Sequence, residues 1–157
     1  STPAIDVLAG VLASGRSSRL YRRLVDDLEL ASEVSAYRVL FRRPGLFYVA
    51  ATLVEGAGLA VVDAEIGAVG ESLACGRLDD EELGRAHALV RTETLRGRET
   101  RLGIAGGLAH WEALGGWERG MAFEEAVPDV GLDAVRRAAS TMLDPAERST
   151  VWLVPGA

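Results

Sequence analysis

The chain has 157 residues, of which 48% are hydrophobic and 25% charged, and it carries a formal net charge of -6. This size and composition favour one soluble globular domain and exclude a disordered or fibrous protein. The acidic balance argues against a nucleic-acid or anionic-membrane surface, and no stretch approaches the roughly 18 apolar residues of a membrane-spanning helix. The single Cys75 rules out an intrachain disulfide, so the compartment stays open between cytoplasm and periplasm.

Two helices are predicted at the start of the chain. Apolar residues recur at helical spacing over residues 4–13, which indicates a buried helix. Gly15 can adopt the left-handed conformation that ends a helix. Ser17 or Ser18 is then expected to cap a second helix, over residues 20–28, by accepting a backbone N–H that has no partner inside the helix.

A β-hairpin is predicted next. Alternating apolar and polar residues from Ser32 to Phe41 indicate a strand. Arg42–Gly45 holds Pro and Gly in the order of a type II turn. The nearly unbroken apolar run Leu46–Val54 then predicts a second strand that is well buried.

Helical patterns fill most of the remaining chain, and the predicted helices cover residues 59–73, 80 to about 101, 102–114, 117–126 and 132–142. Asp79 and Glu82 have the spacing of a capping box, Gly76 fits a helix stop, and Gly97 predicts a bend. Ser149–Val154 is expected to form a closing strand, stopped by Pro155 and Gly156. These elements predict an α+β fold, a two-layer antiparallel sheet with helices packed on one face.

The residues that could carry chemistry form no recognisable catalytic set. His87 and His110 are the only histidines, and neither lies in H-x-x-E-H or its inverse. Catalytic zinc usually takes three protein ligands in a fixed geometry. Both histidines and Cys75 are therefore assigned structural or surface roles. The chain by itself is predicted neither to bind zinc tightly nor to cleave peptides.

Five short motifs follow one another in a fixed order along the chain: Asp6-Val7-Leu8, Gly15 to Tyr21 (Gly-Arg-Ser-Ser-Arg-Leu-Tyr), Val34-Ser35-Ala36, Pro44-Gly45-Leu46-Phe47 and Glu81-Glu82-Leu83. In this order and spacing they resemble the second, non-zinc domain of the pitrilysin, insulinase and mitochondrial processing peptidase family of zinc peptidases, in its bacterial type. Val151–Pro155 also resembles the family's last strand. The resemblance extends from Ala4 to Pro155.

The resemblance implies that residues 1–157 are a single, C-terminal domain of a longer metallopeptidase chain, lacking the domain's first strand. Zinc would be bound upstream in the full-length protein and not by this segment. Paired domains, usually in two chains, would enclose a chamber in which an extended peptide is cut. The implied partners are the upstream zinc-bearing domain, a second subunit in a homo- or heterodimer and the peptide substrate, with no nucleic acid and no membrane. An unfilled strand position would be covered by another copy through edge pairing.

The resemblance implies no catalytic or metal-binding residue in this segment, but it does imply substrate-binding positions: Gly15, Arg16, Ser17, Ser18, Val25 and Ser32. Many family members place an Arg and a Tyr at positions matching Val25 and Ser32, where the pair binds the substrate backbone near the zinc. Their replacement implies that a partner subunit supplies the pair. Ordinary packing and a strand start explain Val25 and Ser32 equally well.

Two alternatives stay open at this point. One is a non-catalytic assembly or peptide-binding subunit of the same family, and the other is a generic α+β interaction domain. An H-x-x-E-H motif upstream in the complete reading frame would favour the peptidase, and its absence there would favour the assembly subunit.

Overall fold

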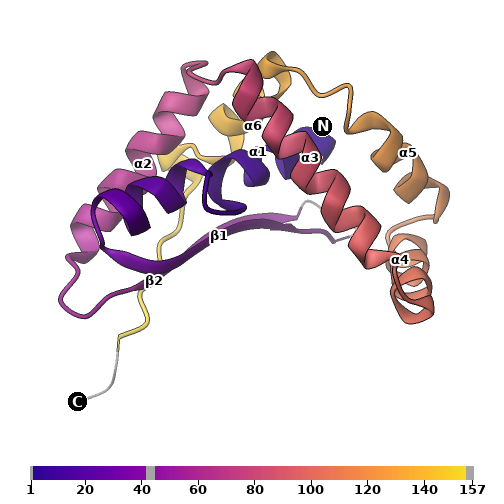
Figure 1. Cartoon of the computed structure of the whole chain (residues 1–157), viewed down its shortest axis with the longest axis horizontal. Coiled ribbons are helices and arrows are strands. Elements are labelled where there is room, and N and C mark those ends of the chain that lie inside the picture. Colours follow the sequence, from indigo (N-terminus) through magenta and orange to yellow (C-terminus); the bar gives the residue numbers. More distant parts are fainter. Residues whose placement is uncertain (1, 42–44, 155–157) are drawn as a thin grey trace.

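The computed structural model describes residues 2–41 and 45–154. Its elements, in chain order, are α1 (Thr2–Ala13), the π-helix η1 (Tyr21–Asp27), β1 (Ala31–Val39), β2 (Leu46–Leu53), α2 (Leu59–Ala74), α3 (Asp80–Gly97), α4 (Arg101–Ala113), α5 (Glu118–Ala126), α6 (Leu132–Met142) and the short 3-10 helix η2 (Pro145–Glu147). Figure 1 shows most of the helices arching over one face of the β1–β2 hairpin, with α4 at one end. The predicted two-layer α+β architecture is confirmed. Among the described helices, none has the length and apolarity needed to span a membrane.

Helix α1 lies at the centre of the core. It contacts α3, α6 and β1, and Val7, Leu8 and Leu12 are at most 1% exposed. Apart from Asp6, the described residues of α1 after Thr2 are apolar, and a helix with apolar residues on nearly every side has to be covered on nearly every side, which explains this central position. The contact with α3 is close because both residues at the crossing are small: a Cβ atom on Gly10 would lie 3.2 Å from the Cβ atom of Ala86.

The hairpin is antiparallel, with Tyr37 opposite Tyr48 and an irregularity near Ala31. The expectation of a well-buried β2 is wrong, because its residues alternate between exposed and half-buried. Helices cover only one face of the sheet, and within residues 2–41 and 45–154 the sheet consists of these two strands alone. The predicted type II turn falls largely on residues 42–44, outside the described part of the chain.

The expected closing strand over Ser149–Val154 is also wrong, since these residues form no strand. The side chains of Arg148 and Thr150 both donate to the carboxylate of Asp63 on α2, at 2.7 and 3.3 Å. The chain beyond Thr150 then leaves the body of the molecule (Figure 1). An apolar, β-prone sequence forms a strand only where its backbone pairs with a sheet edge, and the described residues of this segment pair with neither strand of the hairpin. Pro155 and Gly156 lie outside the described residues.

Local signals at the helix ends agree well with the structure. Gly76 has a φ of 79° and follows the end of α2. The capping box at the start of α3 is confirmed, with the Glu82 N–H donating to Asp79 Oδ1 at 2.8 Å. Gly97 does not bend α3 but ends it, and Thr100 starts α4 by accepting the N–H of Gly103 at 3.0 Å.

Candidate functional site

The loop between α1 and η1 carries four of the predicted site residues, and Ser18 closes it. Gly15 has a φ of 78°, as predicted, and a Cβ atom there would meet nothing within 4 Å. Backbone conformation, not lack of space, is therefore what requires glycine. The expected serine cap is wrong: the Ser18 hydroxyl donates to the Gly15 carbonyl at 2.7 Å, and no described side chain caps η1.

Arg16 and Ser17 form the exposed part of this loop. The Arg16 guanidinium lies 5.9 Å from the centroid of the Tyr21 ring, within cation–π range. A water-sized cavity beside the loop is lined in part by Ser14, Ser17 and Ser18. The exposed Arg16 and Ser17 side chains could donate hydrogen bonds to a bound chain. That they bind substrate stays a prediction.

Val25 and Ser32 lie in different environments. Val25 is half-buried in η1 and packs against the core, whereas Ser32 is exposed on β1. The Ser32 hydroxyl donates to the carbonyl of Thr52 across the hairpin, at 3.3 Å. Among the described residues, no hydrogen bond or ion pair joins either side chain to the 14–18 loop. That Val25 and Ser32 mark an emptied substrate site stays a prediction.

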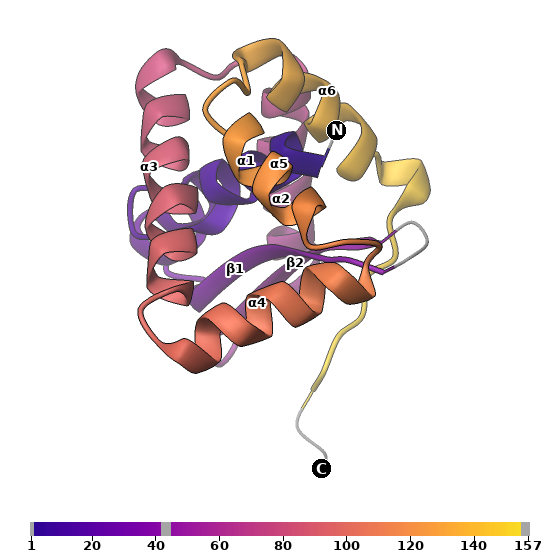
Figure 2. The ribbon, with the colours of Figure 1, turned by 90° about the vertical axis from the view of Figure 1, so that its right-hand side faces the viewer.

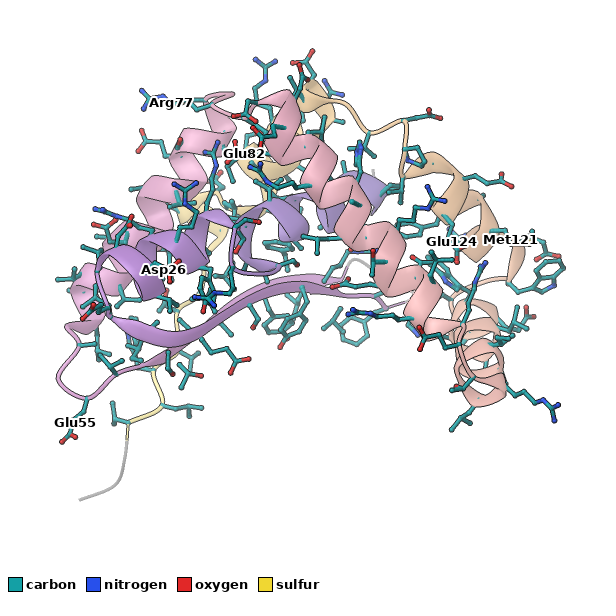
Figure 3. The ribbon with its side chains drawn as sticks, in the orientation of Figure 1. Asp26, Glu55, Arg77, Glu82, Met121 and Glu124 are labelled. Carbon is teal, nitrogen blue, oxygen red and sulfur yellow. The ribbon has the colours of Figure 1, made fainter. Side chains whose placement is uncertain are left out.

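Arg19 is a structural residue that sequence analysis missed. Its guanidinium donates to both Glu82 carboxylate oxygens, at 2.8 and 2.6 Å, to Ser72 Oγ at 3.2 Å, and to the backbone carbonyl of Arg77. Figure 3 shows Arg77 and Glu82 at the junction of α2 and α3 that this arginine bridges. The hydrogen bond from Arg19 holds the pKa of Glu82 below its ordinary value. The capping box already explained Glu82, so nothing in the sequence pointed to this second bond.

Two further arginines join elements that are distant in sequence. Arg23 pairs with Glu65 on α2 through contacts of 2.7 and 3.0 Å, and this hydrogen bonding lowers the pKa of Glu65 and raises that of Arg23. Arg38 on β1 pairs with Asp6 at 2.6 Å and lies 5.5 Å from the ring centroid of Phe123. The Arg38 contact therefore joins α1 to the hairpin, and the Arg23 contact joins η1 to α2 within the helical layer.

The residues present do not fit a zinc site. His87 lies on α3 and His110 on α4, and the free thiol of Cys75 is exposed. Over residues 2–41 and 45–154, no group of three or more His, Cys, Asp or Glu side chains is placed to hold a metal ion. Catalytic zinc needs such a group, so no reaction step on a metal can be derived from these side chains.

The outer face of the hairpin is an exposed, partly aromatic surface. Tyr37 and Tyr48 are 48% and 40% exposed, and their rings stack with centroids 5.3 Å apart and planes 19° apart. Viewed from the side, the helices α1, α2, α5 and α6 lie above the hairpin and α4 runs across below one end of it (Figure 2). Two stacked tyrosines present a flat apolar area with hydroxyls at its rim, which suits contact with a peptide chain.

A sequence model of the family described as the peptidase M16 inactive domain matches residues 2–89. No curated protein matches the chain. The matched residues include the motif loop, the hairpin, α1, η1, α2 and the first ten residues of α3.

Solved structures extend the similarity to nearly the whole chain. The inactive peptidase domain of a candidate zinc protease from Bordetella parapertussis is 29% identical, with a TM-score of 0.86 over 98% of this chain and 84% of that one. A candidate zinc protease from Bordetella pertussis Tohama I is 30% identical, with a TM-score of 0.84 over the same shares. A protease from Helicobacter pylori shares the fold, at 21% identity and a TM-score of 0.80. The aligned region includes 88% of the present chain but only 33% of the Helicobacter protein.

Proposed function

Because this chain belongs to the peptidase M16 family, as its inactive domain, we propose that it is the non-catalytic C-terminal part of a zinc-dependent peptidase. In this proposal it forms one wall of a chamber in which an extended peptide is cut. The zinc-binding residues would lie upstream in the full-length protein. The similarity to domains of candidate zinc proteases supports this assignment.

The observation that carries the proposal is the open outer face of the hairpin. A domain that served only as packing for its neighbours would not need an uncovered surface bearing the Tyr37–Tyr48 stack. An extended peptide can lie along such a surface and also pair its backbone with an open strand edge. The Arg16 and Ser17 side chains on the 14–18 loop add donors on a second exposed region.

The test uses the full-length protein and a quenched fluorescent peptide. Replacing Tyr37 and Tyr48 together by alanine should raise KM by about fivefold or more while kcat changes little, because the wall would bind peptide without touching the reacting bond. Val61→Ala is the matched control, since Val61 is 51% exposed but lies on α2. An unchanged kcat/KM for the tyrosine double variant would contradict the proposal.

Experiments on the full-length protein also distinguish the peptidase from the alternative function, a non-catalytic assembly or peptide-binding subunit. Both readings expect no metal-holding group in this domain, so the discriminating feature lies upstream. A full-length sequence without H-x-x-E-H, together with peptide binding but no cleavage, would favour the alternative function.

A further inference from the structure

We propose that α4 is a hinged flap, folded only while its Trp111 side chain is seated against α5, and that it opens and closes as one unit beside the outer face of the hairpin. The use of this flap, which is to close on a bound peptide, rests on the proposed function. The opening itself can be measured without any peptide or peptidase activity.

Helix α4 is attached to the rest of the molecule by few apolar contacts. None of its residues is buried, and its main contacts are with its neighbours in the chain, α3 and α5. Figure 1 shows it at one end of the hairpin, and Figure 2 shows it running across on the side of the outer face. A segment with few buried apolar contacts has a low free energy of local opening. Helix α4 should therefore open far more often than the central helix α1.

One side chain supplies most of the attachment. The Trp111 ring of α4 packs on α5, where its centroid lies 5.4 Å from that of the Phe123 ring. Gly120 is buried and forms the floor of this contact, since a Cβ atom there would lie 2.5 Å from Cδ1 of the Trp111 indole. Real Cβ atoms do not approach a ring so closely, so only glycine leaves room for the indole. Trp111, Gly120 and Phe123 are called the latch from here on.

The α5 side of the latch is anchored to the core. The Arg38 guanidinium lies 5.5 Å from the centroid of the Phe123 ring, within cation–π range. The Arg38 side chain is only 8% exposed and pairs with Asp6, on the central helix α1, at 2.6 Å. The latch therefore holds α4 against a part of the molecule that is itself firmly packed. When the latch opens, α4 is the part that moves.

Short non-helical connections flank α4 on both sides and can act as hinges. Residues 98–100 separate it from α3, and Gly115 and Gly116 lie between it and α5 with φ angles of 116° and 125°. Glycine reaches such positive φ angles without a steric penalty. Arg98 pairs with Glu124 of α5 at 2.5 Å, and this pair keeps the base of the flap next to α5 (Figure 3).

Helix α4 does not stay helical once Trp111 leaves α5. It has 13 residues, and isolated helices shorter than about 12–15 residues are marginal in water. Gly103, Gly106 and Gly107 lower its helix propensity further. Undocking and unwinding are therefore one event, and each opening exposes the backbone amides of residues 101–113 to exchange with solvent.

The flap carries apolar side chains that a peptide can contact. Leu102, Ile104 and Leu108 are 84%, 46% and 49% exposed. A shallow groove of about 520 Å³ beside Leu108 is completed by Trp117 and by two further α4 residues. An extended peptide with apolar side chains, lying on the outer face of the hairpin and continuing past this end, meets these groups. Because the peptide makes these contacts only with the folded flap, its binding favours the closed state.

Hydrogen exchange read by mass spectrometry tests the latch with two substitutions of the same kind. Gly120→Ala puts a Cβ atom where the indole lies, so the amides of residues 101–113 should exchange about tenfold faster or more, while those of α1 and α6 change less than about twofold. Gly107→Ala is the matched control, because a Cβ atom there meets nothing within 4 Å. Alanine favours the helix over glycine, so this variant should slow the exchange of α4 by about two- to fivefold.

Trp111→Ala separates loss of the latch from damage to α5. It removes the indole without adding an atom beside Gly120, and it should also speed the exchange of α4 about tenfold or more, with a smaller change in α5. The proposal is overturned if Gly120→Ala speeds exchange equally in all helices, if Gly107→Ala acts in the same direction as Gly120→Ala, or if Trp111→Ala leaves the exchange of α4 unchanged.

The quenched peptide of the activity assay tests the use of the flap. At a saturating concentration it should slow the exchange of α4 by about threefold or more, because it binds the closed state better. Binding of the peptide without slower exchange in α4 would overturn this use. Failure of the peptide to bind at all would contradict the proposed function and would leave the results on the latch as they are, so the two failures are distinguishable.

Discussion

Replacing Arg19 with alanine should destabilise the protein by about 2–4 kcal/mol. The Arg19 and Glu82 side chains are only 20% and 18% exposed, and Arg19 also donates to Ser72 and to the Arg77 carbonyl. A hydrogen bond to a charged group contributes about 1.5–3 kcal/mol, and breaking a fully buried pair costs about 3–5 kcal/mol. Because the Arg19–Glu82 pair is partly exposed, the expected loss of stability lies below the upper end of about 5 kcal/mol for a fully buried pair.

Urea unfolding followed by circular dichroism measures the loss, which should appear as a lower midpoint at an unchanged m-value. Arg85→Ala is the control, because Arg85 lies on α3 within one turn of Glu82, the partner of Arg19. The Arg85 and Glu81 side chains form a pair four residues apart and are 38% and 83% exposed. Exposed pairs of this kind contribute about 0.3–0.5 kcal/mol, so the control should cost far less.

The pH dependence gives a second readout of the same contact. The bond from Arg19 lowers the pKa of Glu82 in the folded state. The stabilisation is therefore fully present above the ordinary carboxyl pKa of 4.5 and is lost as the pH falls through the lowered, folded-state value. Arg19→Ala should weaken this loss at acid pH. If Arg19→Ala costs no more than Arg85→Ala, or shows no coupling to Glu82→Gln in a double-mutant cycle, the reasoning is refuted.

Three other outcomes are expected. Gly15→Ala should cost about 1–2 kcal/mol because of its left-handed φ, whereas Gly84→Ala, inside α3 with nothing within 4 Å, should stabilise the fold by about 0.5–1 kcal/mol; equal effects in urea unfolding would contradict this. The chain of residues 1–157 should hold no stoichiometric zinc after chelator treatment and should cleave no quenched peptide, and turnover with bound zinc would show the opposite. If Val25 and Ser32 mark an emptied site, the full-length chain should be nearly inactive until it is mixed with a family partner bearing the Arg and Tyr, because loss of one oxyanion donor typically costs on the order of 10²–10³ in turnover; strong activity of the purified chain alone would count against that interpretation.

The sequence predicted best those features that depend on neighbouring residues. The capping box of Asp79 and Glu82 and the left-handed Gly15 are satisfied within a few residues, so their signals are local. Exposure of β2 depends instead on which distant element covers each face of the sheet. An apolar run such as Leu46–Val54 is compatible with burial on both faces, and only one face is covered.

The candidate site shows the same division. The motif predicts the loop from Gly15 to Ser18, but it does not predict the direction of the Ser18 hydrogen bond. Whether a hydroxyl donates or accepts depends on the surrounding fold. The helix predicted over residues 20–28 is the π-helix η1, a difference that the sequence does not reveal because both helix types repeat apolar residues at similar spacing. Arg19 bonds to Ser72 and Glu82, which lie 53 and 63 positions further along the chain, and no local sequence pattern predicts such contacts.

The central position of α1 has a consequence for synthesis of the chain on the ribosome. Its packing partner α6 begins at Leu132, which is 119 residues after α1 ends at Ala13. At about 5–20 residues per second, the ribosome needs on the order of 6–24 s to supply that partner. Two other partners of α1, the strand β1 and the helix α3, begin earlier, at Ala31 and Asp80, but until α6 emerges the nascent chain carries an apolar helix that it can bury only in part. Such a segment is a natural binding site for chaperones and a starting point for aggregation if translation stalls before α6 emerges.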